Sequence, residues 1–268
     1  MYRFILALSC FLMMLAAPIS AQDFDRGVAA YNNGDYAAAL KEWKPLADAG
    51  SISAQSNLGL MYANGRGVPQ DYKEAAKWYT LAAEQGFAKA QLNLGVMYDI
   101  GEGVPQDHEE AIKWYTLAAE QGNGKAQFNL GLMYYEGEAV PQDYKEAAKW
   151  YTLAAEQGHT KAQTKLGEMY VDGNGVPQVY KLAQSYFELA ARQGSALAQF
   201  NLGEMYQTGI GVLADNVLAN MWFNLSGANG DSNGAKKREK IAKDMTPEDI
   251  SKAQAMARVC MNSNYEKC

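Results

Sequence analysis

The chain has 268 residues, of which 48% are apolar and 20% are charged, and its formal net charge is −6. This composition is ordinary for a folded soluble protein. The mild negative charge leaves no basic footprint of the kind that nucleic-acid-binding proteins carry, so we expect no nucleic acid among its partners.

Residues 1–21 are predicted to be a secretory signal peptide. Arg3 is the basic start, residues 4–19 are largely apolar, and Ala21 provides a small residue at the cleavage position. The apolar stretch is too short for a comfortable membrane span, so we expect no membrane span in the mature chain, and an uncleaved anchor is the alternative. Cleavage near Ala21 predicts a periplasmic or secreted protein.

Residues 22–50 are predicted to form a pair of helices that caps the N-terminal end of the mature chain. The segment Asn33-Gly34-Asp35 has the residue types of a tight turn between them, and Trp43 lies in the second helix. This unit is shorter than the units that follow it.

Residues 51–230 are predicted to consist of five tandem repeats. Glycines recur at a strict spacing of 36 residues, and residues 71–86 recur letter for letter as residues 143–158. Self-similarity at this period is typical of a solenoid, in which each unit buries its apolar side against its neighbours. The recurring glycines are Gly50, Gly86, Gly122, Gly158, Gly194 and Gly230.

Each repeat is predicted to begin with an amphipathic helix. In residues 87–122 the apolar positions with helical spacing are Ala90, Leu94, Met97 and Tyr98. Gly95 stands inside this helix, where a glycine costs about 1 kcal/mol relative to alanine, and it recurs in every copy. We therefore expect the backbone of another helix to pack against it.

A glycine-rich turn and a second helix complete each repeat. Asp107 and Glu110 form a capping-box-like pattern that predicts the start of the second helix. Its buried side is expected to carry Trp114 and Tyr115, and Gly122 suits the left-handed position that ends a helix. Each repeat is therefore predicted to be a helix–turn–helix unit, and we expect about fourteen helices in the whole chain.

The letters shared by the repeats resemble the Sel1-like repeat family, which is related to the tetratricopeptide repeats. The matching text is A-Q-x-x-L-G-x-M-Y-x-x-G-x-G-V-P-Q-D…A-x-x-W-Y-x-x-A-A-x-Q-G, and it covers residues 51–230. The resemblance implies an all-α fold, an α/α superhelical solenoid of Sel1-like helix–turn–helix repeats, with residues 22–50 as a tetratricopeptide-like capping pair. It also implies a bacterial secreted or periplasmic protein.

Residues 231–268 depart from the repeat and are predicted to form C-terminal capping helices. Residues 235–245 can form one helix, and Thr246 is suited to be the N-cap of a last helix that runs to about Cys260. Cys260 and Cys268 remain in the mature chain, and in an oxidising compartment we expect them to form a disulfide.

No catalytic or metal-binding constellation is found in the sequence, so we predict a protein that is not an enzyme and has no metal or cofactor. The two histidines, His108 and His159, are interpreted as surface variants of positions that differ between copies. Secreted cysteine-rich relatives have been described as β-lactamases or penicillin-binding proteins, but they carry a cysteine pair in each repeat, which this chain lacks. A β-lactamase-like or cell-wall-active hydrolase is therefore kept as the alternative.

A partner-binding groove is predicted along the first helices of the repeats, because these line the concave face in tetratricopeptide-like stacks. The middle copies offer an apolar patch and the later copies are acidic, which predicts a partner with an apolar anchor and a basic flank. Two alternatives stay open, since the recurring amides could brace neighbouring helices and Leu92 and Phe128 could pack between repeats. The predicted groove residues are Asn57, Leu92, Asn93, Val96, Phe128, Asn129, Leu132, Tyr135, Lys165, Glu168, Asn201 and Glu204.

The predicted function is a non-catalytic scaffold or adaptor that binds a protein or peptide segment in its concave groove. Stacked repeats expose long surfaces and usually bind rather than catalyse. A secreted factor that binds a host protein is a further alternative, because groove chemistry does not distinguish a host partner from an endogenous one.

Overall fold

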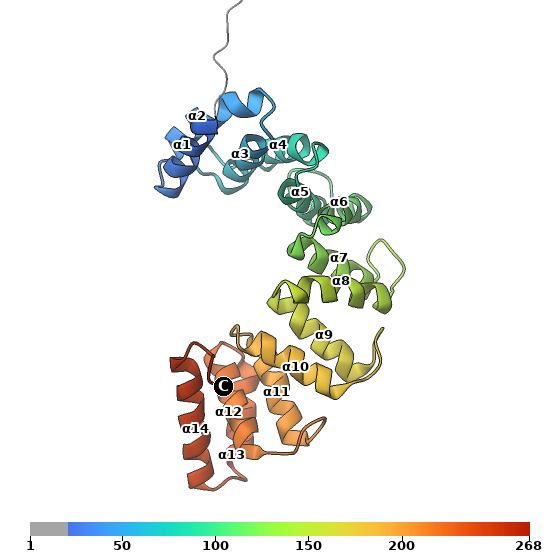
Figure 1. The fold of residues 1–268 in the computed structure, drawn as a ribbon, viewed down its shortest axis with the longest axis vertical. Helices are drawn as coiled ribbons and strands as arrows, with labels where there is room; N and C mark the ends of the chain where they lie inside the picture. Colours follow the sequence, from blue (N-terminus) through green and yellow to red (C-terminus); the bar gives the residue numbers. More distant parts are fainter. Residues whose placement is uncertain (1–20) are drawn as a thin grey trace, which may run out of the picture. The chain divides into compact units, whose positions relative to one another are not determined.

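The computed structural model describes residues 21–268, and within them every regular element is an α-helix (Figure 1). The fourteen helices of these residues confirm the predicted all-α solenoid and the expected number of helices. None of the helices in the described part of the chain is both long and apolar enough to cross a membrane. The predicted signal peptide lies outside the described residues except for Ala21, where α1 begins.

The helices divide into two compact units, one ending at Ala82 and the other beginning at Ala83. The helices of the first unit are α1 (Ala21–Asn32), α2 (Tyr36–Asp48), α3 (Ile52–Asn64) and, up to Ala82, α4 (Tyr72–Glu84). α2 packs between α1 and α3, and its Trp43 is buried. The indole Nε1 of Trp43 donates a hydrogen bond of 3.2 Å to the carbonyl of Phe24, which fixes α1 on α2.

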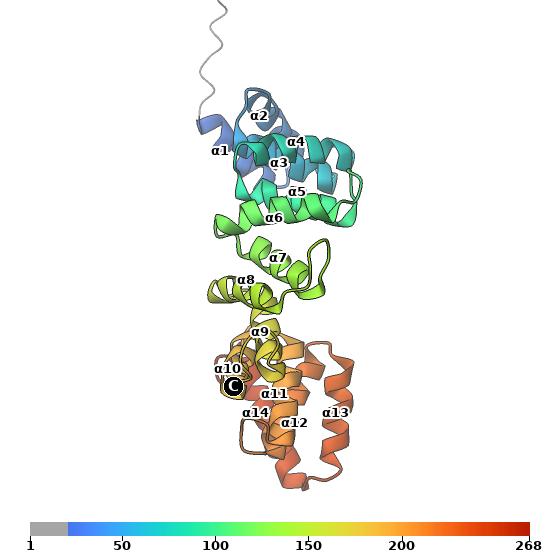
Figure 2. The same cartoon turned by 90° about the vertical axis from the view of Figure 1, so that its right-hand side faces the viewer.

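The second unit stacks helix pairs in chain order (Figures 1 and 2). Within a pair the two helices lie against each other, and the second helix contacts the first helix of the next pair. α12 packs on both helices that follow it. The helices are α5 (Ala88–Ile100), α6 (His108–Glu120), α7 (Gly124–Glu136), α8 (Tyr144–Glu156), α9 (Thr160–Asp172), α10 (Tyr180–Ala191), α11 (Ala196–Thr208), α12 (Asn216–Ala228), α13 (Ser232–Ala242) and α14 (Pro247–Asn262).

Side-chain caps and glycines set the ends of the helices. Asp107 accepts hydrogen bonds of 3.0 Å from the backbone N–H groups of Glu109 and Glu110, and so satisfies donors that the start of α6 leaves free. Glu110 does not complete a capping box, because its carboxylate pairs with Lys113 instead. The preceding helix α5 ends at Gly101, whose φ of 73° is left-handed and therefore favours glycine.

The glycine inside each first helix packs against an aromatic ring, and not against a helix backbone as the sequence predicts. A Cβ atom added at Gly95 would lie 2.7 Å from the ring of Tyr115 on the paired helix, whereas the carbonyl oxygen of Ala111 is 3.4 Å away. The ring fills the space that a side chain would take, so only glycine fits. The same arrangement recurs at Gly131 with Tyr151, Gly167 with Phe187, and Gly203 with Phe223.

A ladder of side-chain amides runs along the second unit. Gln91 of α5 donates from Nε2 to the carbonyl of Ala83 at 3.1 Å, and its Oε1 accepts from Gln121 at the end of α6 at 2.7 Å. The next repeat has the same arrangement around Gln127 and Gln157. Further rungs join Gln163 with Gln193 and Gln199 with Asn229. Because Gln91 and Gln127 are buried, these bonds satisfy polar groups that would otherwise destabilise the fold.

The C-terminal helices follow the prediction with shifted ends. α13 starts at Ser232, before the expected residues 235–245, because Asp231 accepts a hydrogen bond from the N–H of Asn233 and caps the helix there. α14 has Thr246 as its N-cap, as predicted, and runs on to Asn262.

Candidate functional site

Predicted groove residues from two successive first helices line one groove of the second unit. They are Leu92, Asn93 and Val96 of α5, and Phe128 and Asn129 of α7. The groove has a volume of about 730 Å³, and the segment from Gly158 to Lys161 at the start of α9 completes it. Equal repeat lengths bring these positions together, because each first helix presents the same face one repeat further along.

The other predicted residues lie elsewhere. Lys165 lines an adjoining cavity of about 330 Å³ that also includes Phe128. Glu168, Asn201 and Glu204 line a separate cavity of about 280 Å³ between α9 and α11. The predicted residues outside these three cavities are Asn57, which belongs to the first unit, and Leu132 and Tyr135 in the second.

The apolar floor of the groove is also part of the core. Leu92 is only 8% exposed and packs in the same cluster as Tyr115. The ring centroid of half-buried Phe128 lies 5.6 Å from that of Tyr151 and 4.7 Å from that of His159. Leu92 and Phe128 therefore pack between repeats as well as lining the groove, and a substitution at either would disturb folding and binding together.

The two acidic residues of the predicted groove are already paired with lysines. Glu168 lies 2.9 Å from Lys165 of the same helix, and Glu204 of α11 lies 2.7 Å from Lys237 of α13. These partners offset the negative charge that the sequence suggests for the later repeats, so the structure gives little support to a basic flank on a partner.

Three lysines give the groove a cationic rim. Lys89, Lys125 and Lys161 occupy the same position in three successive repeats, 36 residues apart, and all are exposed. They line the 730 Å³ groove and a neighbouring cavity of about 560 Å³, and neither lining contains Asp or Glu. The N-terminal ends of α7 and α9 lie at the same rim, where the helix dipole favours negative charge.

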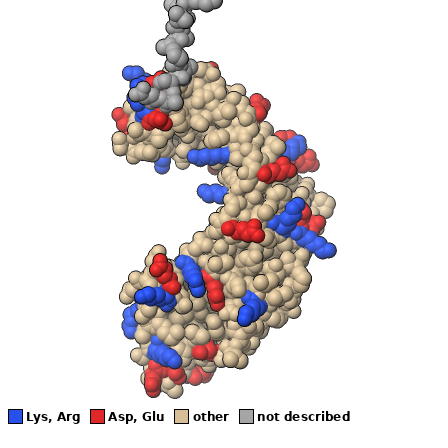
Figure 3. Space-filling model, viewed as in Figure 1, with Lys and Arg blue, Asp and Glu red and all other residues tan. Residues whose placement is uncertain are grey.

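We call this surface the cationic groove, made of Leu92, Asn93, Val96, Lys125, Phe128, Asn129, His159 and Lys161. On the face shown in Figure 3, positive and negative groups are interspersed over the second unit, so a lining with lysines and no acids is a local feature. These lysines are not among the groove residues predicted from the sequence, which belong to other series of first-helix positions. Their spacing of one repeat is the signal that could have found them.

His159 connects the groove to α9. Its Nδ1 accepts a hydrogen bond of 3.3 Å from the N–H of Ala162 and caps the helix, while its ring stacks on Phe128. Burial lowers the pKa of His159, and the charges of Lys161 and Lys125 lower it further. All three causes favour the neutral imidazole, which is the form that can accept the capping hydrogen bond.

Replacing His159 with asparagine is expected to remove one source of acid sensitivity. Because the folded pKa is lowered from 6.5, the unfolded chain binds more protons than the folded chain in the window below that value. The contribution of His159 to the free energy of unfolding is therefore fully present above the unfolded pKa, and it is lost as the pH falls through the folded pKa. Asn123 caps α7 at the corresponding position with an uncharged amide, so His159→Asn keeps the cap.

Urea denaturation of both proteins at pH values above and below 6.5 checks this expectation. The free energy of unfolding should fall less on acidification in His159→Asn than in the wild-type chain. Equal losses in the two proteins would show that His159 does not contribute to the acid sensitivity.

Asn129 lines the groove near the buried Tyr115. The hydroxyl of Tyr115 on α6 donates a hydrogen bond of 3.1 Å to Oδ2 of Asp99 on α5. Burial raises the pKa of Tyr115, and the Asp99 carboxylate raises it further, so the phenol stays protonated.

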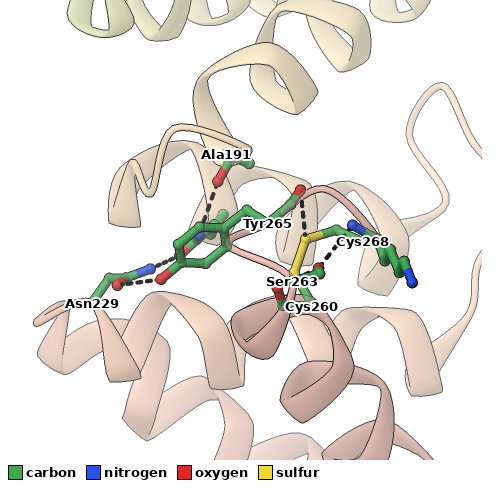
Figure 4. The surroundings of a disulfide bond; sticks show 8 residues. Ala191, Asn229, Cys260, Ser263, Tyr265 and Cys268 are labelled. Atoms are coloured by element: carbon green, nitrogen blue, oxygen red, sulfur yellow. Dashed lines mark hydrogen bonds between the residues drawn. A yellow bond between two sulfur atoms is a disulfide. The ribbon is translucent and has the colours of Figure 1, made fainter.

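The C-terminal cysteines form the expected disulfide. Buried Cys260 of α14 is bonded to Cys268, eight residues further along the chain (Figure 4). The bond closes a loop in which Asn264 and Tyr265 have positive φ values of 51° and 65°. The hydroxyl of Tyr265 donates a hydrogen bond of 2.8 Å to Asn229, the last amide of the ladder. The disulfide therefore constrains the loop that carries Tyr265, the residue bonded to the last amide of the ladder.

The repeats match a known family model. The model described as Sel1 repeat matches five consecutive segments, residues 52–87, 88–123, 124–159, 160–195 and 196–231. Each segment begins at the first residue of a first helix, from α3 to α11. The repeat of the family therefore coincides with the helix pair of the structure.

Two solved structures of similar chains have the same fold. One is a protective antigen of uropathogenic Escherichia coli strains with an SLR fold; it is 36% identical, with a TM-score of 0.80, over 91% of this chain and 53% of that chain. The other is a Sel1 repeat protein from Oxalobacter formigenes, 35% identical with a TM-score of 0.78, over 88% of this chain and 98% of that chain. The chain thus spans about half the length of the Escherichia coli antigen. Among curated proteins, no match was found.

Proposed function

Because the chain belongs to the Sel1-repeat family, whose members generally mediate protein–protein interactions, we propose that it is a non-catalytic scaffold that binds a partner protein in the cationic groove. The partner contributes an extended segment with an apolar anchor for the floor and carboxylates for Lys125 and Lys161. A basic flank that faces Glu168 and Glu204 is not part of this proposal, because Lys165 and Lys237 already pair with those carboxylates.

The observation that carries the proposal is a cationic rim above an apolar floor, in a chain whose net charge is −6. Exposed lysine–carboxylate pairs contribute little affinity each, but they steer association and set the orientation of the bound segment. An apolar side chain seated against Leu92, Val96 and Phe128 supplies the buried contact that dominates affinity in most interfaces. Binding should therefore weaken as the salt concentration rises, since salt screens the exposed charges.

We further propose that the chain acts in the periplasm or outside the cell after removal of its signal peptide. The disulfide between Cys260 and Cys268 supports an oxidising compartment. A secreted factor that contacts a host protein is the second candidate, and the similarity to a protective antigen of uropathogenic Escherichia coli favours it.

Charge reversal at the rim tests the binding proposal. We expect Lys125→Glu/Lys161→Glu to lower the recovery of the partner by about tenfold or more after crosslinking and affinity capture, because two attractive contacts become repulsive. Lys145→Glu/Lys181→Glu is the matched control. It makes the same change of charge at two exposed positions, also 36 residues apart, on the second helices α8 and α10.

The two variants separate the possible outcomes once circular dichroism shows that both are folded. Equal recovery from the rim variant and the control would move the binding site away from the cationic groove. Turnover of nitrocefin or muropeptides by the wild-type chain would contradict the non-catalytic role and favour a hydrolase. Recovery of a partner from host material and not from bacterial extracts would favour the secreted factor.

A further inference from the structure

Three side chains with metal-binding groups meet where the second and third repeats join. Asp99 lies near the end of α5, His108 is the first residue of α6, and Glu138 lies in the turn after α7. One ligand atom of each side chain lies within 4.8 Å of the other two. Nδ1 of His108 is 3.0 Å from Oδ1 of Asp99. From the sequence, His108 is predicted to be a surface variant, whereas the structure places it half-buried against a carboxylate.

The other repeats show that the fold does not require these three groups. The equivalent sets of residues at the other junctions are Ala63, Tyr72 and Glu102; Tyr135, Tyr144 and Asn174; and Val171, Tyr180 and Ile210. At two of those junctions the turn lies close to the start of the second helix, since Gly175 lies against the backbone carbonyl of Tyr144 and Gly211 lies against Cβ of Tyr180. Of these four junctions, only the one between the second and third repeats combines an imidazole with two carboxylates, where the others carry a tyrosine.

The surroundings orient two of the three side chains. The buried Tyr115 donates a hydrogen bond of 3.1 Å to Oδ2 of Asp99, while Oδ1 faces His108. Hydrogen bonds of this kind hold metal-binding carboxylates in place in known sites. Asp99 and His108 belong to helices that pack on each other, so their relative position is set by the core of the repeat. Glu138 is exposed in a turn and is the side chain that can adjust.

We propose that Asp99, His108 and Glu138 bind one divalent transition-metal ion of the Zn²⁺ class, independently of the groove. An imidazole nitrogen together with carboxylate oxygens suits zinc and its neighbours, whereas Mg²⁺ and Ca²⁺ prefer oxygen ligands. Bonds of about 2.0–2.2 Å at tetrahedral angles place ligand atoms about 3.3–3.6 Å apart. A small movement of the exposed Glu138 can bring the three groups, which lie within 4.8 Å of one another, to this separation. Water completes the coordination on the exposed side. The ion would tie the turn of the third repeat to the helices of the second.

Isothermal titration calorimetry of the tag-free, metal-depleted chain with ZnCl₂ tests this site. The protein is kept oxidised so that Cys260 and Cys268 stay in their disulfide and offer no thiolate. We expect one equivalent of Zn²⁺ to bind, with no comparable binding of MgCl₂ or CaCl₂, and a rise of the melting temperature on addition of Zn²⁺.

The sister repeats supply the variants. His108→Tyr introduces the residue found at Tyr72 and Tyr144, so it should fold and lower the affinity for Zn²⁺ by about 100-fold or more. Glu138→Asn introduces the residue found at Asn174 and tests the third proposed ligand, which lies in the turn. His159→Asn removes the other histidine and should leave Zn²⁺ binding unchanged.

Three results would overturn the proposal. One is the same stoichiometry and affinity for Zn²⁺ in His108→Tyr and the wild-type chain. Another is loss of Zn²⁺ binding in His159→Asn alone, which would place the ion at the groove. The third is equally tight binding of Ca²⁺, which would contradict the assignment to a transition metal.

Discussion

Replacing Gly131 with valine is expected to lower the free energy of unfolding by about 3 kcal/mol, the upper part of the usual range for overpacking. A Cβ atom at this position would lie 2.8 Å from the ring of Tyr151, and this tyrosine is completely buried. The ring has no free space to move into, because protein interiors are close-packed. Either α7 or the ring of Tyr151 must shift. Urea denaturation followed by circular dichroism measures the loss.

Gly124→Ala in the same helix is the matched control. Its Cβ atom would lie 3.4 Å from Oε1 of Gln157, which is the end of a flexible side chain. The sister repeats carry Ala88, Thr160 and Ala196 at this position. We expect stability to be unchanged or raised by up to about 1 kcal/mol, because alanine restricts the unfolded chain more than glycine does. Similar losses in Gly124→Ala and Gly131→Val would contradict the role of ring contact.

Replacing Cys268 with serine is expected to destabilise the C-terminal helices by about 2–3 kcal/mol. The disulfide spans a sequence separation of 8 residues, and the chain-entropy model gives about 2.5 kcal/mol for a loop of this size. Cys268 is exposed, so the substitution creates no cavity. Its effect reaches the helices through Tyr265, which loses the constraint that holds its hydroxyl on Asn229.

Hydrogen exchange locates this effect. Cys268→Ser should lose protection in α12 and α14, while α5 to α8 keep theirs, because helices in a solenoid contact only their neighbours. A reductant should reproduce the change in the wild-type chain and add nothing in the variant. Unchanged protection of α14 in both experiments would show that the disulfide contributes no stability.

The sequence predicts the fold well because the repeated letters encode local geometry. Asp107 as a cap and Gly122 at a φ of 83° depend on a few neighbouring residues, and both are found as predicted. Where the letters change, the local structure changes with them. Val179 replaces a capping aspartate and leaves α10 without a side-chain cap, and Ala139 replaces a turn glycine and has a φ of 58°.

The candidate site is predicted only in part, because repeat register gives positions and not contacts. It brings Phe128 and Asn129 to the groove, but it does not show that Phe128 also packs against the ring of Tyr151 in the core. Tyr135 of α7 is also predicted to line the groove, but its ring packs edge-to-face on that of Tyr144, with ring centroids 5.0 Å apart. Contacts across the junction between two repeats cannot be predicted from the register either, because the register does not give the distance between side chains. The distance along the chain from His108 to Glu138 gives no sign that the two side chains meet.

Every rung of the amide ladder uses the same two intervals, eight residues back to an alanine carbonyl and 30 residues forward to the next amide. Loss or duplication of a whole 36-residue unit therefore joins matching rungs, whereas an insertion of another length inside the ladder leaves a buried amide without its partner. The ladder thus favours insertions and deletions whose length is a whole number of repeats. Recombination between the identical residues 71–86 and 143–158, which start 72 residues apart, would add or remove two complete units. Such an event would change the spacing of binding surfaces along the chain and keep every rung closed.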